Sequence, residues 1–167
     1  LHVRSRRQRQ MCIRDSDNDV QKVYASAAKT MSLELAEAEQ LDDILAKRRT
    51  TLCQTIWELL DYRGIRYPKP FSELTGLYDA LFNKIQNNKV STMKKDTLMA
   101  IAIGLRLNAY ATTTLMQKAG IHLNREIEPD RTYLFMLERI PGISIHDANG
   151  VLEATGLEPL GSKYRDQ

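Results

Sequence analysis

The chain has 167 residues, of which 43% are hydrophobic and 27% charged, and it carries a formal net charge of +3. This composition excludes a chain too poor in apolar residues to fold, and no apolar run reaches the roughly 20 residues that a membrane-spanning helix needs. Two cysteines cannot build a disulfide framework or a four-ligand metal site, so we expect a cytoplasmic protein. The length and composition predict a helix-rich protein of about one domain with appendages.

The first sixteen residues differ from the rest of the chain. They read LHVRSRRQRQMCIRDS, a basic run without periodicity that ends abruptly at Asp17. From Arg6 to Asp15 this run resembles the translated adaptor of a transposase-based short-read sequencing library. The alternative is a basic targeting arm or DNA-binding tail. We favour the adaptor, leave residues 1–16 out of the fold argument, and expect the chain to be truncated at its amino-terminal end.

Leaving this segment out changes the charge. It holds five arginines and one aspartate, so the remaining chain has 19 basic and 20 acidic residues and a net charge of −1. The overall basicity therefore gives no argument for nucleic-acid binding. Cys53 becomes an isolated thiol, for which a small buried hydrophobic residue is the default interpretation.

A polar segment and a linker helix are expected over residues 17–50. Residues 17–31 are small and polar with no clear period, and Ser32 can cap a helix that runs to Arg49. Its apolar residues have helical spacing and need a partner surface; they are Leu35, Ala38, Leu41, Ile44 and Leu45. The helix can link a preceding domain or dimerise with a second copy, and we favour the linker.

Residues 51–124 predict a bundle of five helices. Thr51 and Gln54 have the spacing of a capping box before a helix that starts at Leu52 and ends at Gly64. Pro68 suits the first turn of a second helix, which runs to about residue 75. The remaining helices are expected at about 79–87, at 97–107 with Asp96 as the cap, and at about 110–118 before Gly120. No strand pattern rises above this background.

Two further helices are expected in a C-terminal extension over residues 125–167. Asp130 is expected to cap a helix through Arg139, and Ser144 with Asp147 opens a last helix that Gly156 ends. Each helix carries an apolar stripe. The stripes can pack on the bundle, which we favour, or form a homodimer interface suited to reading a palindromic site.

Within residues 71–85 the spacing is typical of a helix-turn-helix. Two short helices that meet at a steep angle need a small residue at their contact, a turn residue without a Cβ clash, and a few inward apolar residues. These roles fall to Phe71, Ser72, Gly76, Leu77, Phe82 and Ile85. The arrangement would hold the second helix out so that it fits the major groove of DNA. A helical hairpin in an unrelated bundle can produce the same pattern.

The order of helices resembles the lambda-repressor/Cro-like helix-turn-helix family. The stretches that carry the resemblance are TIWELLDYRG, FSELTGL, LFNKIQNNK, KKDTLMAIAIGLRLN and LMQKAG, with similarity to bacterial regulator-like members continuing into DRTYLFMLE and GLEPLG. The resemblance implies an all-α, five-helix DNA-binding bundle with flanking helices. It also implies sequence-specific binding of double-stranded DNA, by a transcriptional regulator or by the DNA-targeting end of a longer protein.

The resemblance implies a set of groove-facing residues on the second helix of the motif: Tyr78, Asp79, Ala80, Asn83, Lys84 and Asn87. Asn83 can pair with adenine, Lys84 with guanine or a phosphate, and Ala80 with a thymine methyl group. Related domains often have serine or threonine where Tyr78 stands. Asp79 places an anion near phosphates, unless it caps the helix or accepts a hydrogen bond from cytosine.

Lysines around the motif are expected to contact phosphates. Residues 51–120 carry nine basic and five acidic side chains, a local charge of +4. Lys69, Lys89, Lys94 and Lys95 lie at helix starts or loops where such contacts are typical. The alternative for each is an ordinary solvated lysine.

The competing class of function is a helical protein-interaction module that has lost DNA contact.

We expect no enzyme, no metal and no cofactor. His122 and His146 lack partners at metal-site spacing, so surface or cap roles are favoured. No nucleophile elbow, phosphate-binding glycine loop or paired-cysteine motif occurs.

Overall fold

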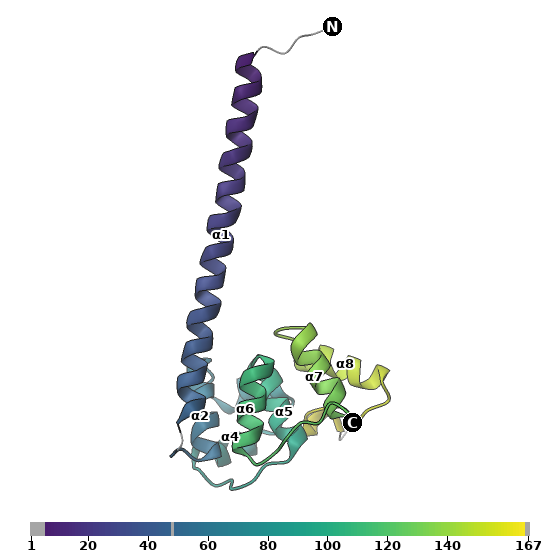
Figure 1. The fold of residues 1–167 in the computed structure, drawn as a ribbon. Helices are drawn as coiled ribbons and strands as arrows, with labels where there is room; N and C mark the ends of the chain where they lie inside the picture. The colour runs from purple at the N-terminus through teal and green to yellow at the C-terminus, as the bar shows by residue number, and fades with distance from the viewer. Residues whose placement is uncertain (1–5, 48, 166–167) are drawn as a thin grey trace. The chain divides into compact units, whose positions relative to one another are not determined.

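The computed structural model describes residues 6–47 and 49–165, with side chains from residue 19 onward (Figure 1). Regular structure in these ranges is helical, without a strand, which confirms the all-α class. The chain divides into two compact units, one up to Gln40 and one from Leu41 onward. No helix in the described ranges is both long enough and apolar enough to cross a membrane.

Helix α1 (Arg6–Ala46) begins well before the expected start, so the prediction that Ser32 caps a helix was wrong. The Ser32 hydroxyl lies within the helix and donates to the carbonyl oxygen of Lys29 at 2.8 Å. Alanine, glutamate, lysine and glutamine are strong helix formers, and they sustain a helix here without an apolar period. Of the adaptor-like segment, residues 1–5 lie outside the described residues and residues 6–16 belong to α1.

The expected apolar stripe of α1 is buried only near its end. Leu41 and Leu45 are buried in the core of the second unit, and Ile44 is half-buried. Leu35 is 63% exposed. The helix ends at Ala46 rather than at Arg49, and the hydroxyl of Thr50 donates to the carbonyl oxygen of Lys47 just after it.

The expected five helices of residues 51–124 are all present, with bounds shifted by up to three residues. They are α2 (Leu52–Tyr62), α3 (Pro68–Thr75), α4 (Asp79–Gln86), α5 (Lys95–Gly104) and α6 (Ala109–Lys118). The capping box of Thr51 and Gln54 is confirmed, with both reciprocal hydrogen bonds formed. Asp96 lies inside the first turn of α5 and Lys94 is the N-cap, so the prediction that Asp96 caps this helix was wrong.

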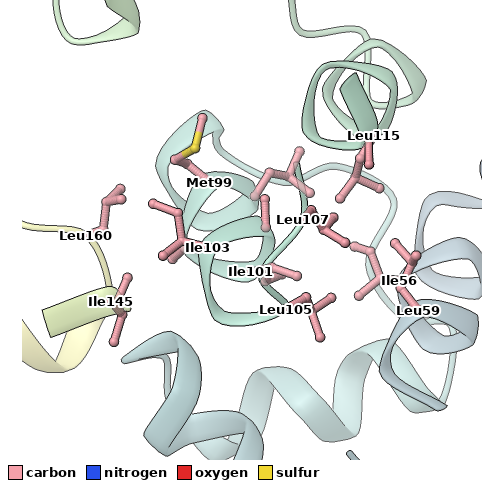
Figure 2. Close-up of a cluster of buried hydrophobic side chains, with 14 of the residues drawn as sticks. Ile56, Leu59, Met99, Ile101, Ile103, Leu105, Leu107, Leu115, Ile145 and Leu160 are labelled. Carbon is pink, nitrogen blue, oxygen red and sulfur yellow. The ribbon is translucent and has the colours of Figure 1, made fainter. Parts of the chain in front are cut away.

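Helix α5 forms the centre of the second unit. Its residues from Leu98 to Gly104 are all buried, and it packs against α3, α6 and α8. Figure 2 shows its side chains meeting those of neighbouring helices, among them Ile56, Leu59 and Leu115. A helix that is apolar on every side is stable only when other elements cover it, so α5 organises the helices around it.

The C-terminal extension folds onto this core. Helices α7 (Asp130–Arg139) and α8 (Ile145–Ala154) contribute buried residues such as Tyr133 and Leu152. The Ser144 cap of α8 is confirmed. Asp130 was expected to cap α7, but its carboxylate accepts from the backbone N–H of Asn124, outside that helix. A short helix α9 (Ser162–Arg165) was not expected.

At Gly104 the backbone of α5 lies very close to α3, and this approach can be tested. A Cβ atom there would lie 2.6 Å from Cγ2 of Thr75 and 2.8 Å from the carbonyl oxygen of Leu74. We predict that Gly104→Ala lowers the free energy of unfolding by about 1–3 kcal/mol, because the backbone of α3 must shift.

Gly150 offers the matched control, since it lies inside α8 and a Cβ there would meet nothing within 4 Å. Gly150→Ala should raise the free energy of unfolding by up to about 1 kcal/mol through helix propensity. Urea unfolding of both variants measures this contrast, and a Gly104→Ala protein as stable as the parent would contradict the close approach.

Candidate nucleic-acid interface

Side-chain hydrogen bonds hold the turn between α3 and α4. Gly76 ends α3 in the left-handed conformation, with φ of 66° and its N–H donating to the carbonyl oxygen of Ser72. The hydroxyl of Ser72 donates to the carbonyl oxygen of Leu77 at 2.7 Å, and the N–H of Leu77 donates to Oγ1 of Thr75. Glycine adopts this conformation without a steric cost, so the chain can reverse tightly here.

Aromatic packing fixes the inner side of α4. Phe82 and Ile85 are buried, and the Phe82 ring lies 5.6 Å from that of Phe71 on α3 and 5.5 Å from that of Trp57 on α2. Ring pairs at such separations add to the stabilisation that comes from burial. The burial expected from the motif spacing is therefore confirmed for the inward apolar residues.

The opposite side of α4, here called the outer face, is exposed. It consists of the six residues expected to face a groove, and each of them is exposed: Tyr78, Asp79, Ala80, Asn83, Lys84 and Asn87. The side-chain amide of Asn87 donates to the carbonyl oxygen of Asn83 at 2.7 Å, so one of its donors is already engaged. Tyr78 is the N-cap and makes no side-chain cap bond, and Asp79 is the first helical residue. The alternative in which Asp79 caps α4 was therefore wrong.

The expected phosphate-contacting lysines have different surroundings. Lys69, Lys89 and Lys94 are exposed. Lys95 instead lies 2.7 Å from the carboxylate of Asp130, whose side chain is only 1% exposed. Because a buried carboxylate without a cation would be costly, Lys95 stabilises the fold by pairing with Asp130.

A polar groove adjoins Lys89. It is lined by residues from the start of α2, the segment after α4 and the end of α6, among them Thr51, Asn88 and Lys118. The Thr51 hydroxyl donates to Oδ1 of Asn88 at 2.7 Å, which ties α2 to the segment after α4. Lys118 donates to the carbonyl oxygen of Lys47 and to Thr50, and partial burial lowers its pKa. Neither Thr51 nor Lys118 was among the predicted site residues.

Asp96 joins the C-terminal extension to α5. Its carboxylate accepts from the Tyr133 hydroxyl at 3.2 Å and from Nη2 of Arg165 at 2.7 Å. These partners are 37 and 69 residues away along the chain, so local sequence patterns do not reveal them. The network fixes α9 near the start of α5.

The histidines and the described cysteine form no metal-ligand group in the part of the chain that the structure describes. His122 and His146 are exposed, and no group of three or more His, Cys, Asp or Glu residues in those ranges could hold a metal ion. Cys53 is buried and its thiol donates to the carbonyl oxygen of Val90 at 3.1 Å.

Comparisons of the chain with protein-family models, with curated proteins and with solved structures give no match. The lambda-repressor-like resemblance therefore rests on the quoted sequence stretches and stays a prediction.

The raised pKa of the Tyr133 hydroxyl predicts how the free energy of unfolding changes at alkaline pH. Burial, followed by the neighbouring carboxylate of Asp96, raises the pKa of Tyr133 above its ordinary value of about 10. Above that pH the unfolded chain releases the phenolic proton while the folded chain keeps it, so the unfolded state gains stability. The free energy of unfolding should therefore fall from about pH 10 upward.

Tyr133→Phe removes the titrating group and should flatten this fall, although it also lowers stability at neutral pH by removing a hydrogen bond. Urea unfolding at a series of pH values between about 8 and 11 compares the two slopes. Equal slopes in the parent and in Tyr133→Phe would contradict the prediction.

Proposed function

We propose that this protein binds double-stranded DNA in a sequence-specific way, with α3, the turn at Gly76 and α4 acting as a helix-turn-helix. The observation that carries the proposal is the contrast between the two sides of α4. Its inner side is held by buried Phe82 and Ile85, while every residue of its outer face is exposed. A helix fixed in this way can enter a major groove without local rearrangement.

The chemistry of the outer face suits base edges. Asn83 carries an amide that can donate to and accept from adenine, and Lys84 can donate to guanine or to a phosphate. Ala80 is small and apolar, as contact with a thymine methyl group requires. These groups lie on successive turns of α4, so one helix would read neighbouring base pairs.

Exposed lysines precede and follow α4 along the chain and support the proposal. Lys69 lies in the first turn of α3, Lys89 follows α4, and Lys94 precedes α5. Lysines so placed can contact the backbone on both sides of the groove and fix the position of α4. Lys95 is left out of this set because it is paired with Asp130. The protein would then act as a transcriptional regulator or as the DNA-targeting end of a longer protein.

The test is binding of the full chain to a random duplex, measured by fluorescence anisotropy over a range of salt concentrations. The logarithm of the binding constant should fall linearly with that of the salt concentration, by roughly 0.9 per phosphate contact. A protein-interaction module without DNA contact would show no binding to the duplex at any salt concentration.

Lys84→Glu should weaken binding at moderate salt by tenfold or more, about 1.4 kcal/mol, because it places an anion in the groove. Arg139→Glu is the control, since it makes the same change of charge at the exposed C-terminal end of α7. Unchanged affinity of Lys84→Glu, or an equal loss in both variants, would contradict the assignment of the outer face.

A further inference from the structure

The C-terminal segment packs directly against the turn that precedes α4. The backbone N–H of Lys163 donates to the carbonyl oxygen of Gly76 at 3.0 Å, and the ring of Tyr164 covers Gly76. A Cβ atom at Gly161 would lie 2.8 Å from that same carbonyl oxygen, so glycine is required for this approach. The backbone of residues 161–163 is thereby held against the turn.

This backbone contact places the Lys163 ammonium beside the first residue of α4. Its Nζ lies 3.9 Å from Oδ1 of Asp79, and the two side chains are 41% and 57% exposed. A pair at this separation in water is weak, and an ammonium has three donors. Lys163 therefore offsets the charge of Asp79 while its head remains accessible to solvent.

Arg165 fixes α9 from its other end. Its guanidinium donates to the carboxylate of Asp96 at 2.7 Å and to the carbonyl oxygen of Pro159 at 2.9 Å. The two cations of α9 thus differ in their surroundings. Arg165 is engaged in holding the segment, whereas Lys163 extends toward the outer face of α4.

We propose that Lys163 contacts a DNA phosphate beside the first turn of α4, so that the C-terminal segment forms part of the DNA interface. The inference rests on the proposed function. In that docking the N-terminal residues of the second helix contact base edges while the first helix crosses the phosphate backbone. Lys163 is held against the turn that joins these two helices, and this places its ammonium where it can reach that backbone. Lys163 also reduces the repulsion that Asp79 would otherwise exert on that phosphate.

The test measures salt-dependent binding of the full chain to a random duplex for the parent, Lys163→Gln, Asp79→Asn and the double variant. Lys163→Gln should lower the salt slope by about 0.9, the value for one phosphate contact, and should weaken binding at low salt. The loss should persist in the Asp79→Asn background. A loss seen only when Asp79 is present would mean that Lys163 merely neutralises it, and would overturn the proposal.

Two controls separate a phosphate contact made by Lys163 from a general loss of positive charge. Lys163→Arg keeps the charge and should keep the slope, while Arg139→Gln removes one charge from the end of α7 and should leave the slope unchanged. An equal loss in Arg139→Gln would overturn the proposal. Lys163→Gln keeps the backbone bond to Gly76, and its thermal unfolding checks that the fold is retained.

The proposed function and the role of Lys163 can be overturned separately. If the parent binds with a dependence on Lys84 and Lys163→Gln has no effect, the proposed function stands and the role of Lys163 is overturned. If the parent binds no duplex at all, both are overturned.

Discussion

The burial of α5 from Leu98 to Gly104 is the constraint on which the rest of the second unit depends. Its residues from Leu98 to Gly104 find apolar partners on several sides, and Gly104 lets the backbone of α3 come within contact. The position of α3 sets the turn at Gly76, and the turn sets which side of α4 is buried. The exposed outer face thus depends on the packing of α5 as well as on the helical spacing of α4's own apolar residues.

The C-terminal extension is joined to this core by hydrogen bonds and ion pairs. Two carboxylates near the start of α5 and α7 bind groups from distant segments: Asp96 binds the Arg165 guanidinium and the Tyr133 hydroxyl, and Asp130 binds the Lys95 ammonium. One effect is to pair Lys95 with a buried carboxylate. Another is to bring α9 to the turn before α4, where Lys163 lies beside Asp79.

Much of the fold could be predicted because its signals are local. A capping box at Thr51 and Gln54, proline at position 68 and glycine at position 76 act within one or two turns, and all three behave as expected. The start of α1 was missed because helix propensity sustains that helix where no apolar period exists.

The candidate site divides in the same way. Burial of Phe82 and Ile85 and exposure of Asn83 and Lys84 follow from helical periodicity, so the sequence sufficed for them. The pairing of Lys95 with Asp130 and the approach of Lys163 to Asp79 join residues far apart along the chain. Such contacts depend on the tertiary arrangement, and neither spacing nor composition indicates them.

The two glycines that meet at the turn, Gly76 and Gly161, have a practical consequence for handling this protein. The backbone of residues 161–163 is held against the turn at the beginning of α4. Under the proposed function, an affinity handle or fluorescent reporter attached at residues 161–163 would lie beside the surface proposed to meet DNA, and it would add its own charge near Asp79. Labels for solution work are better attached at an exposed loop such as the one around Glu126.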